Sequence, residues 1–352
     1  MRKITVDSSE DGRRLDHVLR NLLPEATQAF FHKMLRKKNI VVNDGRSEGA
    51  YRVRTGDEIT LYLSEETIDR FSKSAQRITE ETERFAKAFA VLRGDAGAGI
   101  RIVYEDDALM LLNKPAGILS QRAGGNDLSV NEWIVGYLLE NGKMDEAQLG
   151  QFRPSVANRL DRGTSGLMVC VKTLSAAREF ASLQQGGGLR KDYLAIVSGC
   201  AEEAFSATKA IVKDHAKNTV SLREDQIPGA EACRERMRAI PLYINRAEKI
   251  SMMRLTLLDG KSHQLRAQLS DKGFPVLGDT KYGDPGINRR MRERFGLRTQ
   301  LLHSESLTFP EEVTGSLKAM SGRRFQAPLP EIFCRVQDVF FDPEDETGGA
   351  GR

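Results

Sequence analysis

The chain of 352 residues has little cysteine, one tryptophan and no long apolar run. Its cysteines are too sparse for a disulfide scaffold and too scattered for a zinc site, so we expect reduced thiols at all of them: Cys170, Cys200, Cys233 and Cys334. No stretch approaches the roughly 20 apolar residues that a membrane-spanning helix needs. Near the start, Asp7, Glu10 and Asp11 interrupt any apolar segment of an export signal. We therefore expect a cytoplasmic protein that does not contact a membrane.

Length and composition favour a globular protein of two domains. A chain of 352 residues exceeds what one hydrophobic core usually serves. Hydrophobic residues make up 40% and charged residues 29%, as in ordinary globular domains.

The net charge of +4 is too small to establish a nucleic-acid partner, but its distribution is uneven. Residues 30–54 contain seven basic and two acidic side chains. By contrast, residues 342–352 form an acidic, Gly-rich stretch, which we interpret as a mobile tail.

The first 64 residues are expected to fold as a small module of two helices followed by strands. Apolar residues recur at helical spacing in 15–22 and again from residue 30. Strand patterns follow at 40–42 and 59–63, with turn residues between them. This order resembles the alpha-L RNA-binding motif, which implies an RNA-binding module over residues 1–64.

A basic cluster lies on or just after the second of these helices, where it could track RNA phosphates. A solvated helix face is the competing interpretation. The cluster comprises Lys33, Arg36, Lys37 and Lys38.

Beyond this module, an amphipathic helix over 64–92 is expected to form a linker, so that residues 65–99 join the module to a larger domain at 100–341. Strand and helix patterns alternate there without strict order, which indicates an α+β fold on a mixed, largely antiparallel sheet with flanking helices. Strands are expected at 101–104, 108–112, 167–171, 193–197, 207–212, 219–222, 252–258 and 301–303, and helices at 129–139, 174–183 and 263–269.

Residues 158–166 carry the most specific pattern, Asn-Arg-Leu-Asp-Arg-Gly-Thr-Ser-Gly, directly before an apolar strand. A carboxylate in a Gly-punctuated loop with an arginine on either side is expected to stay ionised. Asp161 could then act as a nucleophile. Alternatively, Asp161 only caps a turn.

This pattern resembles the signature of the RluA-type pseudouridine synthases, and other blocks extend the likeness: residues 103–106, 113–117, 190–195, 260–266, 273–279 and 302–304. The resemblance implies that a uridine within RNA is isomerised, without a metal or an organic cofactor. Large-subunit ribosomal RNA is the expected partner, and we expect a monomer. Two other hypotheses stay open: a catalytically silent RNA-binding assembly factor and a carbohydrate hydrolase.

Carried over by position, the resemblance implies a role for each of four residues. Asp161 would attack or deprotonate the ribose, with Arg266 paired to it. Tyr193 would stack on the uracil and serve as a base, and Arg159 would help to extrude the nucleotide. The competing interpretations are a strand aromatic for Tyr193, a solvent-facing Arg266, a helix cap for His263 and a turn residue for Asp279.

The sequence departs from the family pattern at three places, which puts the details of RNA contact in doubt. Asn158 and Gln268 stand where the family often has histidine, and residues 259–261 replace a Thr-Gly-Arg.

Overall fold

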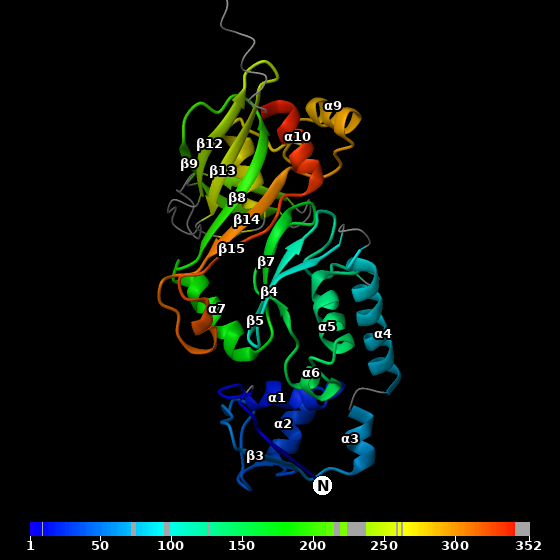
Figure 1. Ribbon diagram of the computed structural model, residues 1–352. Coiled ribbons are helices and arrows are strands. Elements are labelled where there is room, and N and C mark those ends of the chain that lie inside the picture. The colour runs from blue at the N-terminus through cyan, green and yellow to red at the C-terminus, as the bar shows by residue number, and fades with distance from the viewer. Residues whose placement is uncertain are drawn as a thin grey trace, which may run out of the picture. The chain divides into compact units, whose positions relative to one another are not determined.

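A computed structural model describes residues 1–8, 10–71, 75–94, 99–124, 127–207, 209–214, 219–223, 237–257, 260–261 and 263–341 (Figure 1). The acidic stretch at 342–352 and Cys233 lie outside the described residues. The other cysteines are free thiols. Within the described residues, no helix is long and apolar enough to span a bilayer, and no cluster of three or more His, Cys, Asp or Glu side chains is placed to hold a metal ion.

The N-terminal residues form two helices over a three-stranded antiparallel sheet in the order β1-β3-β2. These elements are β1 (Arg2–Thr5), α1 (Leu15–Leu22), α2 (Gln28–Arg36), β2 (Ile40–Val42) and β3 (Glu58–Leu61). Their core is built entirely from residues 4–71, with Leu15, Leu19 and Ile59 fully buried.

The helix expected over 64–92 is described as two helices, α3 (Glu65–Phe71) and α4 (Ala75–Leu92). The first of them belongs to the N-terminal core, because Ile68 is buried there and the Phe71 ring lies 4.6 Å from that of Phe30. On α4, by contrast, Phe85 and Ala88 are buried outside that core.

A ten-stranded mixed sheet organises the rest of the chain, in the order β4-β5-β7-β14-β8-β13-β12-β9, with β15 on β14 and β6 on β7. The expected α+β fold is confirmed, since most of the pairings are antiparallel and β7 with β14 is parallel. The strands are β4 (Arg101–Glu105), β5 (Leu109–Lys114), β6 (Ser155–Val156), β7 (Ser165–Val171), β8 (Arg190–Ser198), β9 (Phe205–Ala207), β12 (Met237–Asn245), β13 (Ile250–Leu257), β14 (Leu302–Thr308) and β15 (Arg324–Gln326). A separate antiparallel pair is β10 (Ala210–Asp214) with β11 (Thr219–Arg223).

Helices accompany this sheet, among them three that the sequence patterns did not predict: α6, α9 and α10. Their bounds are α5 (Val130–Glu140), α6 (Glu146–Gln151), α7 (Leu174–Gln185), α8 (Gln264–Asp271), α9 (Pro285–Phe295) and α10 (Glu331–Phe341), with a 3-10 helix at Gly315–Met320. Residues of α9 and α10 share a core cluster with Leu194 and Ile196 of β8.

One expectation for the strands was wrong, because the strand expected at 207–212 is described as β9 and β10. Four further strands were not expected: β1, β6, β12 and β15. Within β12, Pro241 lies beside a register shift, where a missing backbone N–H is tolerated.

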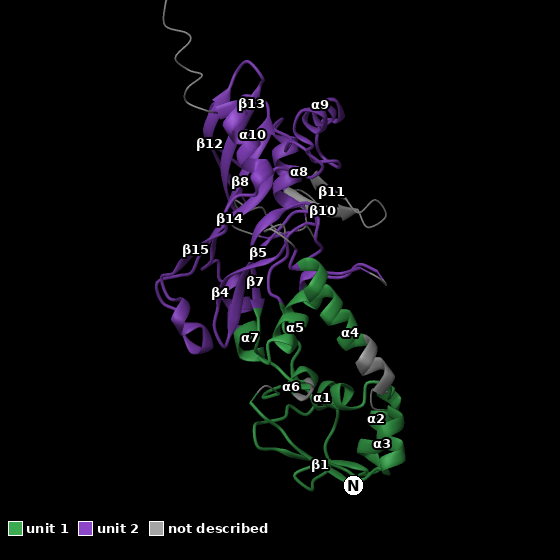
Figure 2. Cartoon of the chain, turned by 45° about the vertical axis from the view of Figure 1, so that its right-hand side comes forward, with its two compact units in different colours: residues 1–92, 131–155, 171–178 green, residues 93–130, 156–170, 179–352 purple. Residues whose placement is uncertain are grey.

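The chain forms two compact units (Figure 2). The first comprises residues 1–92, 131–155 and 171–178, and the second comprises 93–130, 156–170 and 179–352. The units are defined by contacts within the fold. Their bounds therefore differ from the domain boundary at residue 100 that was expected from the sequence.

Candidate active site

Asp161 lies in the loop that enters β7, and its neighbours on both sides are anchored. The Ser120 hydroxyl donates to the carbonyl of Leu160 at 2.6 Å and accepts from its N–H at 3.1 Å. On the other side, the carbonyl of Arg162 accepts from the Gly117 N–H at 2.7 Å. The backbone that carries the Asp161 carboxylate is therefore held in place before any ligand binds.

Close packing explains why glycine stands at the two positions that follow Asp161, residues 163 and 166. A Cβ at Gly163 would collide with the side chain of Gln300, which donates to the Thr164 hydroxyl at 3.1 Å. Gly166 has φ +110°, and a Cβ there would meet the backbone of Ser304 on the parallel neighbour β14. The glycine spacing of the motif thus follows from the close approach of this loop to residues 300–304.

Arg266, on α8, bridges two carboxylates. Its Nε and Nη2 donate to Asp279, both at 2.7 Å, and its Nη1 donates to Asp161 Oδ2 at 2.8 Å. Burial alone would lower the pKa of Arg266, but the two carboxylates outweigh that effect and raise it. Arg266 is only 5% exposed, which excludes the solvent-facing alternative. Because the bidentate contact fixes the guanidinium plane, Arg266 presents one N–H to Asp161.

Asp279 is completely buried and holds Arg266 in place. It also accepts from the N–H groups of Lys281 at 2.9 Å and Tyr282 at 3.1 Å, so it does cap a turn. Burial by itself would raise the pKa of Asp279, whereas the hydrogen bonds and charge of Arg266 lower it below its ordinary value. The sequence indicated the turn but not the ion pair.

His263 lies at the N-cap position of α8 with φ 56°, but its side chain caps nothing. Its Nδ1 instead lies 3.0 Å from the Tyr282 hydroxyl, which also accepts from the Val220 N–H. Its Nε2 lies 4.0 Å from Asp161 Oδ1. Burial lowers the pKa of His263 more than the Asp161 charge raises it, so the environment favours the neutral ring.

Tyr193 is in the middle of β8 and is 5% exposed. Burial first, and then the negative charge of Asp161, raise the pKa of Tyr193 to about 12, against the effect of a hydrogen bond with Ser304. The phenol therefore keeps its proton at neutral pH.

A cleft of about 1670 Å³ brings three of the residues named from the sequence together: Asp161, Tyr193 and Arg266 all line it. Arg159 also lines it and is exposed. Among the described lining residues, Asp161 is the only carboxylate. Eight basic side chains line the cleft with it: Arg122, Arg159, Arg162, Lys191, Lys261, Arg266, Lys281 and Arg298.

Lys114 was part of a matching block but was not identified as a site residue. It is fully buried, and its Nζ donates to the carbonyls of Pro115, Ile118 and Arg162 at 3.0, 3.0 and 3.3 Å. Burial lowers the pKa of Lys114 to about 7, although the Asp161 charge opposes the shift. Lys114 thus ties the loop after β5 to the loop of Asp161. A lysine at the end of a strand that begins with four apolar residues was the available signal.

The basic cluster expected to bind phosphates lies in the other compact unit. Lys33 and Arg36 are exposed on α2, and Lys37 and Lys38 are exposed just after it. The opposite side of α2 is buried through Phe31, Met34 and Leu35, which keeps the basic side chains on the outer face.

Comparisons with known proteins agree with one another. A family model described as RNA pseudouridylate synthase matches residues 108–271. Among curated proteins, the chain is 27% identical to ribosomal large subunit pseudouridine synthase C of Haemophilus influenzae, over 90% of this chain and 89% of that protein. The enzyme of the same name from Escherichia coli K12 is 26% identical over 93% of both chains. Among solved structures, human RNA pseudouridylate synthase domain containing 4 matches 75% of this chain and 97% of that one, with a TM-score of 0.53 at 21% identity.

Proposed function

The chain belongs to the RNA pseudouridylate synthase family, and from that premise we propose that it isomerises uridine in large-subunit ribosomal RNA with Asp161 as its catalytic carboxylate. In this reaction the bond from the ribose to nitrogen breaks and a carbon–carbon bond to the same base forms. The base is retained, so the product is an isomer of the substrate. The relatives named above carry ribosomal large subunit in their names, which supports this choice of RNA.

The charge pattern of the cleft carries the proposal. Eight basic side chains and one carboxylate line it among the described residues. Such a lining attracts a polyanion and leaves a single acidic group to act on it. Glycoside hydrolysis usually needs two carboxylates, so the pattern favours isomerisation over the carbohydrate hydrolase considered from the sequence.

We assign the roles as follows. Asp161 acts on the ribose of the extruded uridine, and Arg266 positions the Asp161 carboxylate. The Tyr193 ring packs against the uracil, and its hydroxyl serves as the base for the proton on carbon 5, releasing its own proton to solvent as it accepts that one. Arg159, exposed in the cleft lining, occupies the place that the extruded nucleotide leaves in the stack.

We further propose that residues 1–64 bind RNA as a separate module through Lys33, Arg36, Lys37 and Lys38. Residues 65–99 would link this module to the catalytic domain at 100–341. The self-contained core of residues 4–71 supports the module.

The test is the release of tritium from carbon 5 of uridine in unmodified ribosomal RNA. We expect release by the native protein and none by Asp161→Asn, which keeps the size of the side chain but removes its charge. Asp107→Asn, at an exposed aspartate outside the cleft lining, is the matched control and should release tritium like the native protein.

Binding of the same RNA is measured in parallel for all three proteins. If the native protein binds RNA but releases no tritium, the proposal is wrong and the silent assembly factor becomes the better explanation.

A further inference from the structure

Helix α9 begins and ends beside the catalytic cleft. The chain leaves the cleft lining at Lys281, forms α9, and returns to the lining at Arg298. The helix is well delimited: the Asp284 side chain accepts from the Ile287 N–H at 2.8 Å, and Gly296 ends the helix with φ 71°. Over 11 residues it is about 16 Å long.

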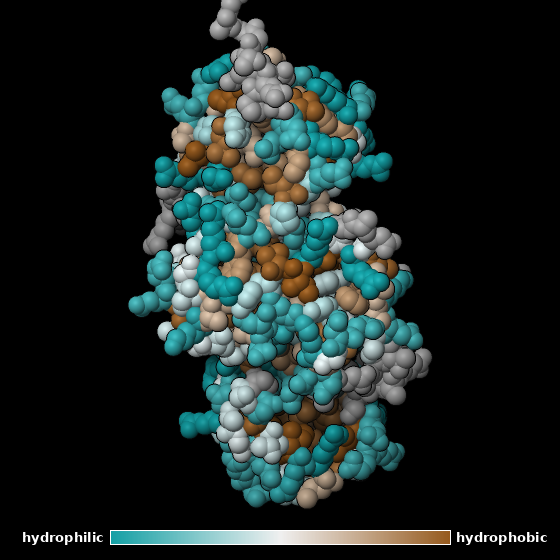
Figure 3. All heavy atoms as spheres, viewed as in Figure 1, coloured by the Kyte–Doolittle hydropathy of each residue, from teal (hydrophilic) through white to brown (hydrophobic). Residues whose placement is uncertain are grey.

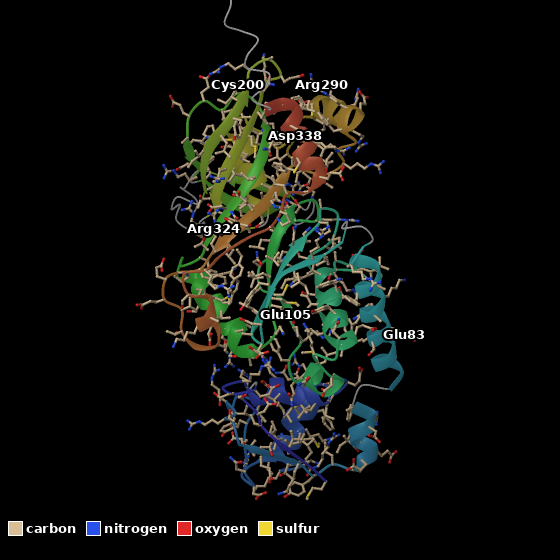
Figure 4. All side chains as sticks on the ribbon, in the orientation of Figure 1. Glu83, Glu105, Cys200, Arg290, Arg324 and Asp338 are labelled. Carbon is tan, nitrogen blue, oxygen red and sulfur yellow. The ribbon has the colours of Figure 1, made fainter. Side chains whose placement is uncertain are left out.

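One face of α9 is buried and the other is exposed. Met291, with Ile287 and Phe295 one turn on either side, packs in the core cluster beneath β8 and α10. Helical spacing therefore turns Arg289, Arg290 and Arg292 outward, and all three are exposed. The surface over α9 is hydrophilic in Figure 3, and Figure 4 labels Arg290 on this helix. We call these three arginines the arginine ridge.

The ridge is part of a strongly basic segment of the catalytic unit. Residues 281–298 contain six basic and two acidic side chains, a net charge of +4 that equals the net charge of the whole chain. Arg294 is paired with Glu248 at 3.1 Å. Among the described residues, no ion pair neutralises the three arginines of the ridge, and Glu293 is the one acidic residue within α9.

Hydrogen bonds also fix α9 to the residues that position Asp161. The Asn288 side chain accepts from the Gly278 N–H and donates to the Asp279 carbonyl, both at 2.8 Å. Asp279 holds Arg266, which in turn contacts Asp161. The ridge is therefore held in a fixed relation to the catalytic carboxylate.

We propose that the arginine ridge binds the phosphodiester backbone of the RNA strand that flanks the target uridine, outside the cleft. This inference rests on the proposed function, because it adds an RNA contact to the same catalytic cleft. The occupant is RNA on grounds of charge complementarity, and the guanidinium fork suits phosphate oxygens. Because phosphates carry no sequence information, the ridge would position the RNA rather than select the uridine.

The test measures how RNA binding depends on salt. The variant Arg289→Gln/Arg290→Gln/Arg292→Gln is titrated against a ribosomal RNA fragment transcribed in vitro, at several salt concentrations. Each lost phosphate contact should reduce the slope of log affinity against log salt by about 1. We therefore expect a slope smaller by about 2 to 3 than that of the native protein.

Two further variants make the result specific. Arg101→Gln/Arg238→Gln/Arg335→Gln removes three exposed arginines of the same compact unit outside the cleft lining, and should keep the native slope. Arg289→Lys/Arg290→Lys/Arg292→Lys keeps the charge and should keep most of the slope. Thermal unfolding of each variant reports whether the fold is intact.

An unchanged slope in the glutamine variant of the ridge, or an equal loss in the control variant or in the lysine variant, overturns the inference. Tritium release by the native protein is measured separately. If the native protein releases none but the slope falls as expected, the proposed function fails while the ridge stands as an RNA-binding surface.

Discussion

Arg266 stands between two aspartates that differ in exposure and therefore in what each can do. Asp279 is completely buried and accepts two hydrogen bonds from the guanidinium. The Asp161 side chain is 24% exposed and accepts one, through Oδ2. Its Oδ1 accepts no hydrogen bond from the described residues, and His263 Nε2 lies 4.0 Å away from it. One carboxylate thus holds the arginine, and the other keeps an oxygen free for substrate.

Lys114 predicts a pH dependence of stability. Its pKa is about 7 in the folded protein and 10.5 in its ordinary state. Between these values the unfolded chain binds more protons, so the free energy of unfolding should rise with pH, by at most about 1.4 kcal/mol per pH unit. Denaturant unfolding of the native protein and of Lys114→Met between pH 6 and 10 checks this. The difference between their stabilities should grow in favour of the native protein across that window; a constant difference would contradict the low pKa.

At the scale of elements, the loop of Asp161 depends on how closely β7 and β14 approach. Gly166→Ala would place a Cβ against the Ser304 backbone at a positive φ. We expect a loss of about 1–3 kcal/mol in the free energy of unfolding, with tritium release reduced as the loop shifts.

Gly150→Ala is the matched control. Gly150 lies within α6, its Cβ would meet nothing within 4 Å, and its φ is not positive. This substitution should stabilise the protein by up to about 1 kcal/mol. Equal effects of the two alanines on denaturant unfolding would show that the approach of β7 to β14 does not constrain residue 166.

Local patterns predicted the elements that have strong periodicity, and missed those that lack it. The apolar runs of β7 and β8 and the helical spacing of α5 and α7 were readable. α9 was missed because only Ile287, Met291 and Phe295 mark its buried face, although Asp284, Pro285 and Gly296 are ordinary helix boundary signals.

Site residues could be predicted from the sequence only where a motif or the family resemblance indicated them. Residues 158–166 pointed to Asp161, and the family resemblance pointed to Arg266 and Tyr193. Asp279 and Lys114 act through contacts with residues distant in sequence, such as Lys114 with Arg162. No local pattern encodes such pairings.

At the scale of the whole molecule, two basic surfaces belong to different compact units, one on α2 and one on α9. Lys37→Gln/Lys38→Gln should weaken RNA binding and reduce its salt slope by about 1 to 2. Lys249→Gln/Lys318→Gln, at two exposed lysines outside the cleft lining, should keep the native slope. Fluorescence anisotropy with the same RNA fragment measures the salt slope of both variants. A native slope in the Lys37→Gln/Lys38→Gln variant would exclude RNA binding by the basic cluster of α2.

The parallel pairing of β7 with β14 also sets an order of events during synthesis. The loop of Asp161 rests on Ser304 and Gln300, which are translated some 140 residues later, whereas the core of the N-terminal module is complete by residue 71. At about 5–20 residues per second, the ribosome needs roughly 10 to 50 seconds to translate the chain from residue 71 to residue 304. On the proposed function, a nascent chain can therefore bind RNA well before it can modify it, and an enzyme truncated before β14 would occupy its substrate without turning it over.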